Sequence, residues 1–292
     1  MKLRNKLPEL CIILAAFLWG LTGIFVRKLN QAGLDNMQLI FFRSSVTAIL
    51  LGVFLLFKDR TKLKIALKDW WYFFGTGVLS FTLFGFCYFY TIQHSSMSLA
   101  AMLLYTAPIF VMIMASIFFH EKITAIKIVA LIAAISGCVM ICTTKQAAPV
   151  SPFIVFTGLG SGFCYALYSI FGEVALKKYT SATVTFYTFL FAAVASMFVV
   201  DFNTIGTVYK TDPGAILLAI VFAIVSAFFP YLLYTQGLKN TEPGKAAVMA
   251  TFEAVVASVA GIVVFNESIT LVAILGIVLV LSSVVLLNKK AH

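Results

Sequence analysis

Charged side chains are scarce in this sequence, at 11% of 292 residues, whereas soluble domains carry about a quarter. Hydrophobic residues make up 62%, and the mean hydropathy is +1.03. A soluble core of this size cannot bury that much apolar surface. The composition therefore excludes a water-soluble globule and predicts a membrane protein whose side chains face lipid or other helices.

Metal-binding and nucleophilic side chains are also sparse. The three histidines, His94, His120 and His292, are scattered, and the five cysteines show neither a C-x-x-C motif nor a paired loop spacing. This pattern predicts packed free thiols rather than disulfides or a metal site. Since no nucleophile–base pair occurs at membrane depth either, we expect no catalytic residue, no metal, no cofactor and no enzymatic activity.

The apolar residues fall into ten runs, each near the roughly 20 residues that a helix needs to cross a bilayer. Short polar segments such as Asp212-Pro213-Gly214 separate them. The predicted spans are 9–28, 35–57, 69–93, 97–119, 124–142, 152–173, 182–200, 213–237, 246–265 and 269–287. The basic start before the first run predicts an uncleaved helix, because no small-residue cleavage site follows it.

Lysine and arginine are distributed unevenly between the two sides that this span count defines. With the N-terminus inside, the inner segments hold sixteen of them and the outer segments four, while Arg43 lies within a span. Cytoplasmic loops carry such an excess. We therefore expect a multi-pass protein of the cytoplasmic membrane with both termini in the cytoplasm. The net charge of +10 reflects this orientation rather than binding to nucleic acid.

The two halves of the chain are alike at an offset of 146 residues. Phe119-His120-Glu121-Lys122-Ile123-Thr124 aligns with Phe265-Asn266-Glu267-Ser268-Ile269-Thr270, and Phe17-Leu18-Trp19 aligns with Phe163-Cys164-Tyr165. Each half, residues 1–146 and 147–292, holds five spans, and an odd number turns the second half upside down. The predicted fold is an all-α membrane protein whose ten transmembrane helices form two inverted five-helix repeats around a central cavity.

The sequence resembles the ten-span EamA-type branch of the drug/metabolite transporter superfamily. The motifs that carry this resemblance are Ala15-Ala16-Phe17-Leu18-Trp19-Gly20 in span one, Phe41-Phe42-Arg43 in span two, and Ser95 to Ala101 at the start of span four, with Pro108 within the same span. Two glutamates, Glu121 and Glu267, add to it, since each is followed two residues later by Ile-Thr. The resemblance implies a cavity lined mainly by spans 1, 3, 4, 6, 8 and 9, with spans 5 and 10 peripheral. The family's acidic-Pro pair in span nine reads Glu253-Ala254 here, so no proline kink is implied at that point.

Two ionisable residues lie deep inside predicted spans. Glu253 lies roughly 10 Å into span nine and Arg43 roughly 12 Å into span two, at 1.5 Å per residue. A charge at this depth costs at least ~2.5 kcal/mol and usually faces a cavity. Glu253 could anchor a substrate amine, couple transport to protons or pair with Arg43. Arg43 could hold a substrate carboxylate or bind backbone carbonyls between helices.

Aromatic residues make up 15% of the chain, and many lie in the spans that the resemblance assigns to the cavity. Their rings attract organic cations and suit apolar solutes, although Tyr and Trp also populate membrane interfaces. The repeat-related residues Trp19 and Tyr165 are the strongest candidates. The predicted substrate-binding residues are Trp19, Arg43, Tyr88, Tyr105, Tyr165, Tyr168, Tyr234 and Glu253.

Three residues inside the spans are predicted to bend helices or to act in gating. Pro108 and Pro230 lack a backbone N–H and so free a carbonyl within spans four and eight. Gly20 lies in span one, next to Trp19.

The function that fits this architecture is secondary transport, in which one repeat rocks against the other around a site at the midplane. The expected substrates are small organic solutes, with amino acids and related metabolites or amines first and organic cations such as quaternary amines second. A lipid-carrier flippase of the same architecture is an alternative. The expected partners are a small-molecule substrate and the lipid bilayer. The protein is expected to be a monomer or a homodimer, and transport with or without coupling to protons is left open.

Overall fold

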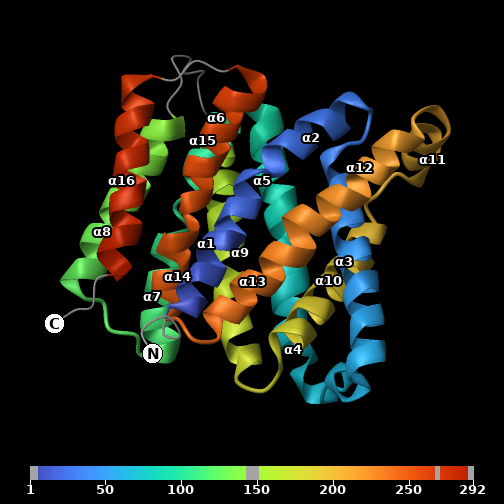
Figure 1. Ribbon diagram of the computed structural model, residues 1–292, viewed down its shortest axis with the longest axis horizontal. Helices are drawn as coiled ribbons and strands as arrows, with labels where there is room; N and C mark the ends of the chain where they lie inside the picture. Colours follow the sequence, from blue (N-terminus) through green and yellow to red (C-terminus); the bar gives the residue numbers. More distant parts are fainter. Residues whose placement is uncertain (1–5, 96, 143–150, 267–269, 289–292) are drawn as a thin grey trace.

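The computed structural model describes residues 6–95, 97–142, 151–266 and 270–288. Helices and their connections make up these ranges, and no strand occurs within them. Helix α1 begins and helix α16 ends at the same face of the molecule, at the bottom of Figure 1. We call this face the inner face and the opposite one the outer face.

The first half of the chain forms five spans, of which the third and fourth are built from several short helices. The elements are α1 (Leu7–Gly20), α2 (Thr22–Gln31), α3 (Asn36–Lys58), η1 (Arg60–Leu63), η2 (Leu67–Asp69), α4 (Trp70–Phe74), η3 (Gly75–Thr82), α5 (Leu83–His94), α6 (Met97–Leu104), α7 (Ala107–Phe119) and α8 (Ala125–Cys142).

The second half follows the same order. Its elements are α9 (Pro152–Leu176), α10 (Ser181–Met197), α11 (Phe202–Thr211), α12 (Pro213–Ala223), η4 (Ile224–Phe228), α13 (Phe229–Leu238), α14 (Pro243–Ala250), α15 (Phe252–Phe265) and α16 (Leu271–Asn288).

The fold class predicted from the sequence is confirmed. Within the described residues, eight helical segments are long and apolar enough to cross a membrane, and α10 with α11 makes a ninth if this pair counts as one span. Helix α16 supplies a shorter apolar helix, so each predicted span has a counterpart.

The seventh span is shorter than predicted. The apolar run predicts a span over 182–200, but α10 ends at Met197 and the chain bends by 98° into α11. Asp201 caps α11, because its carboxylate accepts hydrogen bonds from the backbone N–H of Asn203 and the hydroxyl of Thr204. The cap starts a new helix directly beyond the end of the predicted span.

Local irregularities recur at the 146-residue offset and support the two-repeat architecture. Span three contains the π-helix η3 and span eight contains the π-helix η4, at overlapping positions of the two halves. Helices α7 and α15 both end on a left-handed residue, His120 with φ 55° and Asn266 with φ 53°. Left-handed backbone is uncommon outside glycine, so its recurrence reflects a shared local fold.

The two halves are inverted with respect to one another. Helix α1 runs from the inner face to the outer face, whereas α9, the first helix of the second half, runs the opposite way (Figure 1). The predicted boundary between residues 146 and 147 falls in 143–150, outside the described residues.

Helix ends lie at or next to the three residues that the sequence predicts to bend helices or to act in gating. Helix α1 ends at Gly20 and α2 begins two residues later. Pro108 is the second residue of α7, where a missing N–H breaks no intrahelical hydrogen bond, whereas Pro230 is the second residue of α13, which directly follows the π-helix η4. Span nine also breaks, at Thr251 between α14 and α15, although no proline is present. This break corresponds at the repeat offset to the one at Tyr105 in span four.

Spans five and ten pack against each other at one edge of the molecule, at the left of Figure 1. A Cβ on Gly137 of α8 would lie 2.6 Å from the carbonyl oxygen of Gly276 in α16, and the reverse is also true. Only glycine permits such close approach of two helix backbones. These two spans contribute no residue to the central pockets described below, in agreement with the peripheral position that the resemblance implies.

Candidate functional site

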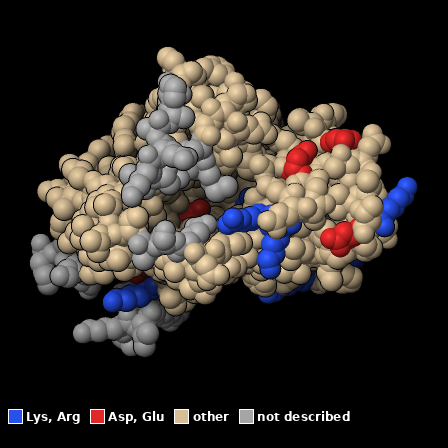
Figure 2. All heavy atoms as spheres, turned by 90° about the horizontal axis from the view of Figure 1, so that it is seen from above, with Lys and Arg blue, Asp and Glu red and all other residues tan. Residues whose placement is uncertain are grey.

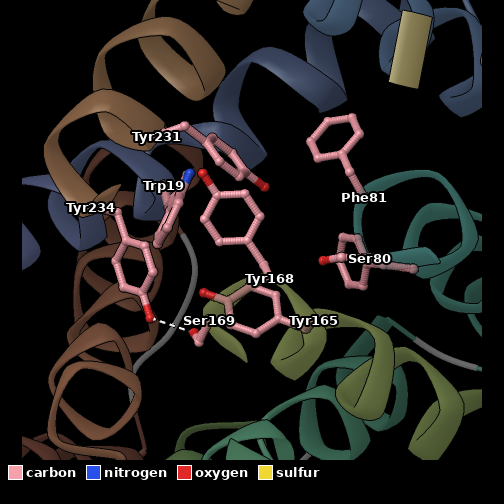
Figure 3. A pocket seen from close by; sticks show the side chains of 9 residues that line it. Trp19, Ser80, Phe81, Tyr165, Tyr168, Ser169, Tyr231 and Tyr234 are labelled. Atoms are coloured by element: carbon pink, nitrogen blue, oxygen red, sulfur yellow. Dashed lines mark hydrogen bonds between the residues drawn. The ribbon is translucent and has the colours of Figure 1, made fainter. Parts of the chain in front are cut away.

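An aromatic pocket lies at the centre of the molecule, between spans one, three, six and eight. It is lined by Trp19, Ser80, Phe81, Phe84, Tyr165, Tyr168, Ser169, Tyr231 and Tyr234 (Figure 3). Its free volume is about 10 Å³, which is the room that one water molecule needs. A solute can therefore enter only if these rings separate.

Trp19 is the hub of the aromatic pocket. Its ring centroid lies 5.1 Å from that of Tyr231, 5.3 Å from that of Tyr234 and 6.3 Å from that of Tyr165. Edge-to-face or tilted contacts of this length are the favoured geometry for aromatic pairs. Trp19 is 7% exposed, and its indole Nε1 has no hydrogen-bond partner in the described part of the chain. A buried donor without a protein partner is rare, and a water molecule or a bound acceptor could satisfy it.

Hydrogen bonds between spans six and eight fix two of the tyrosines. The hydroxyls of Tyr168 and Thr235 lie 2.8 Å apart, as do those of Ser169 and Tyr234, the pair marked in Figure 3. All four hydroxyls are buried, so each bond gives a partner to two polar groups that would otherwise lack one. These bonds close the aromatic pocket toward the inner face.

A second pocket, which we call the acidic pocket, adjoins the first one. Its lining comes from spans four, six and nine and consists of Leu104, Tyr105, Ala107, Pro108, Tyr165, Ala247, Ala250, Thr251 and Glu253. Its free volume is about 20 Å³. Because Tyr165 lines both pockets, the Glu253 carboxylate and the aromatic cluster are separated by a single side chain.

Glu253 has no direct partner among the described residues. Its carboxylate accepts no hydrogen bond from, and forms no ion pair with, any residue among those described, although the side chain is only partly exposed. Tyr88, Tyr105 and Tyr165 are close enough to interact with its charge. A carboxylate at this depth needs a compensating charge, a proton or water.

Arg43 binds a backbone carbonyl, as one of the two sequence interpretations predicted. Its Nη2 donates to the carbonyl oxygen of Ser226, which lies in the π-helix η4, at 3.0 Å. The guanidinium lies over the rings of Phe81 and Phe222, at 5.2 and 5.5 Å, and its Nε has no hydrogen-bond partner in the part of the chain that the structure describes. Arg43 and Glu253 interact electrostatically but form no ion pair within 4 Å. The alternative in which Glu253 pairs directly with Arg43 is therefore not realised.

The site is more open toward the outer face than toward the inner face. Tyr105, Tyr165 and Glu253 are partly exposed, whereas Tyr168 and Tyr234 are 5% and 2% exposed. Figure 2, seen from the outer face, shows a hollow near the middle of the molecule with acidic side-chain atoms inside it. The central pockets are therefore more deeply buried on the side of the inner face than on the side of the outer face.

Most residues that the sequence singled out come together in these two pockets. The aromatic pocket takes Trp19, Tyr165, Tyr168 and Tyr234, and the acidic pocket takes Tyr105, Pro108 and Glu253, with Tyr165 shared. Tyr88 lines neither pocket but stacks on Phe84, with ring centroids 5.5 Å apart. Gly20 and Pro230 lie at helix breaks next to the aromatic pocket residues Trp19 and Tyr231.

Sequence reasoning missed Ser80, Phe81 and Phe84, which line the aromatic pocket from span three. With 29 phenylalanines in the chain, residue type gives no means of singling out two of them. The described residues hold no group of three or more His, Cys, Asp or Glu side chains that could bind a metal.

Comparison with protein families identifies two matching segments, residues 6–143 and 152–289, each described as EamA-like transporter family. The chain belongs to the EamA-like transporter family. Each segment lies within one of the two halves of the chain, and membership confirms the resemblance to the drug/metabolite transporter superfamily. An EamA family member is a membrane transporter and not an enzyme.

Similar proteins support the family but say little about the substrate. An uncharacterized transporter of Archaeoglobus fulgidus is 28% identical over 95% of both chains. A protein of Pseudomonas aeruginosa named pseudopaline exporter is 25% identical over 66% of this chain and 64% of its own. A solved structure titled "Crystal structure of protein" matches with a TM-score of 0.80 over 96% of this chain and 95% of its own, at 12% identity, which shows the fold alone.

Proposed function

We propose that this EamA family transporter moves small organic solutes with a positively charged amino group, namely amino acids and related amines, by alternating access. The observation that carries the proposal is the unpaired, partly exposed carboxylate of Glu253 beside the aromatic cluster. An ammonium group would neutralise the carboxylate, and the neighbouring tyrosine faces would stabilise the same cation.

Two buried donors favour amino acids over simple amines. Trp19 Nε1 and Arg43 Nε both lack a partner in the described ranges. Trp19 lines the aromatic pocket, and Arg43 lies over Phe81, which lines it as well. A substrate carboxylate would accept hydrogen bonds from such donors, while its ammonium group would bind Glu253. The named export of pseudopaline by a relative is compatible with an organic substrate but does not define this one.

The membrane and the orientation are part of the proposal. The excess of lysine and arginine in the segments at the inner face supports a cytoplasmic position of that face, with both termini in the cytoplasm. The described conformation then faces the outside of the cell.

Transport by purified protein in liposomes tests the substrate class. We would measure exchange of a labelled amino acid, such as tyrosine, and of tyramine, the amine that lacks its carboxylate. Glu253→Gln should weaken binding of both compounds by about 10- to 100-fold, since a hydrogen bond to a charged group contributes about 1.5–3 kcal/mol. Trp19→Phe keeps an aromatic ring and removes only Nε1, so it should weaken binding of the amino acid by about tenfold and spare the amine.

Glu173→Gln is the matched control. Glu173 also lies within a span, α9, but it faces a cavity at the inner face and touches neither central pocket. It should bind both compounds like the unchanged protein. If Glu253→Gln leaves the affinity unchanged and lowers only thermal stability, Glu253 is structural. If quaternary amines are exchanged and amino acids are not, the protein is an organic-cation carrier instead.

A further inference from the structure

The helices around the central pockets form two groups. On one side, α1 packs against α13, α14 and α15, and on the other side η3, α5, α6 and α7 pack against α9. Opening the inner half of the transport path requires these two groups to separate at their inner ends. Contacts that cross from one group to the other at this face are therefore candidates for a gate.

Lys127 lies at the centre of one such crossing contact, which we call the Lys127 bridge. Its ammonium lies 2.7 Å from Glu121 Oε1, just beyond the end of α7, and 2.7 Å from Glu242 Oε2, just before α14. It also donates to the carbonyl oxygen of Lys122 at 2.9 Å. Lys127 is 8% exposed and the Glu121 side chain 6%, so this ion pair is buried, whereas the Glu242 side chain is 59% exposed and joins the pair from the cavity side.

Glu121 extends the bridge to the backbone of α14. Its second oxygen, Oε2, accepts a hydrogen bond from the N–H of Gly244 at 3.3 Å. A Cβ on Gly244 would lie 2.9 Å from Glu121 Oε1, so the approach needs a glycine at this position. The first turn of α14 is thus held against the end of α7 by both a carboxylate and a lysine.

The Lys127 bridge lies at the boundary between an open cavity and a closed layer. Toward the inner face, a cavity of about 840 Å³ is lined by Glu121, Lys127 and Glu242 among others. Ile12 of α1, Leu238 of α13 and Met249 of α14, each at most 1% exposed, belong to the same buried apolar cluster as Trp19 and Tyr231 of the aromatic pocket, and we call these three residues the apolar layer. Leu238 also lines the cavity, which shares no lining residue with either central pocket.

We propose that the Lys127 bridge is the inner gate of the transporter, which forms when the protein faces outward and breaks when it opens inward. The cluster carries two carboxylates and one ammonium, and losing one partner of a buried ion pair leaves an uncompensated buried charge. Removing Lys127 would leave the two carboxylates, Glu121 and Glu242, to repel each other across the boundary between the two groups of helices. The closed inner end would then lose stability relative to the open one.

Two other ion pairs at the inner face do not cross between the groups. Lys245 in α14 binds Glu9 in α1 at 2.7 Å, within the first group. Lys178, in the loop after α9, binds Asp69 in η2 at 2.8 Å, within the second group. The hydrogen bond to Asp69 raises the pKa of Lys178 above its usual value. Since both partners of each pair move together, these pairs are expected to persist when the gate opens.

Labelling of a cysteine in the apolar layer tests the proposal. Met249→Cys supplies the reporter in a chain whose five native cysteines are replaced, and a membrane-impermeant thiol reagent is applied to intact cells and to inverted vesicles. With the Lys127 bridge intact, labelling should be slow from both sides. Lys127→Met should speed labelling from the cytoplasmic side by about tenfold or more.

The matched control is Lys178→Met, which removes an ion pair at the same face and should leave the labelling rate unchanged. Lys127→Glu combined with Glu242→Lys restores a lysine between two carboxylates and should return labelling to the slow rate. The proposal is overturned if Lys127→Met labels no faster than its parent, if Lys178→Met speeds labelling equally, or if the double exchange labels as fast as Lys127→Met. Labelling needs no substrate, so the result is independent of the proposed substrate class.

Discussion

Replacing Gly20 by alanine tests the close approach of span one to span nine beside the central pockets. A Cβ at Gly20 would lie 2.5 Å from the Cβ of Val256 and 2.8 Å from the carbonyl oxygen of Glu253. One neighbour is a β-branched side chain and the other is backbone, so neither can turn away. Because ordinary Cβ contacts begin at 3.4 Å, α1 and α15 would have to separate by roughly 1 Å.

This separation is expected to lower the free energy of unfolding by about 1–3 kcal/mol, the usual cost of overpacking a well-packed interior. The thermal unfolding midpoint of the purified protein in detergent should fall by several degrees. Transport should fall as well, since the displaced carbonyl belongs to Glu253, the residue that we propose binds the substrate.

Gly23→Ala is the matched control, three residues further along the same span. No atom lies within 4 Å of a Cβ there, and alanine favours a helix over glycine by about 0.5–1 kcal/mol. This variant should therefore be as stable as the parent or slightly more stable. The reasoning is refuted if Gly20→Ala unfolds at the same temperature as Gly23→Ala, because the close contact would then have no energetic consequence.

Three further predictions follow from local contacts. Tyr168→Phe removes the hydrogen bond to Thr235 and should lower stability by about 1 kcal/mol in thermal unfolding. Gly137→Leu should push spans five and ten apart at Gly276 and strongly destabilise the protein. Because the central pockets stay intact, the substrate affinity of the folded fraction should not change. Hydrogen bonds from Thr204 and the Asn203 backbone lower the pKa of Asp201 below its usual 3.8. The Asp201 cap should therefore stabilise α11 above pH 3.8, and this stabilisation should be lost as the pH falls through the lowered pKa of Asp201. The measurement is amide hydrogen exchange, which should become faster in α11 when the cap is lost.

The fold was predictable because lipid imposes a simple rule on sequence. A backbone in hydrocarbon must satisfy its own hydrogen bonds, so a run of about 20 apolar residues can only be a helix. Ten runs, the 146-residue repeat and the distribution of lysine and arginine follow from the printed sequence alone. The seventh span was too long by three residues, since hydropathy does not register the Asp201 cap that begins α11.

The candidate site was predictable in part. Glu253 stands out because a charge inside an apolar run is costly and thus seldom without purpose. Trp19 and Tyr165 stand out through the repeat, and the two rings do meet, with centroids 6.3 Å apart. Phe81 has no such signal, and its place in the aromatic pocket follows from how span three packs against spans six and eight.

The sequence by itself determined that the protein lies in lipid and not in water, and it determined the number and order of the spans, the inverted repeat and the family. Only the tertiary structure decided that Arg43 binds the Ser226 carbonyl instead of Glu253, and that Lys127 joins Glu121 to Glu242. Hydropathy and periodicity are properties of neighbouring residues along the chain, whereas the contacts of Arg43 with Ser226 and of Lys127 with Glu242 join residues more than a hundred positions apart. Their partners are set by which helix faces meet in the packed bundle.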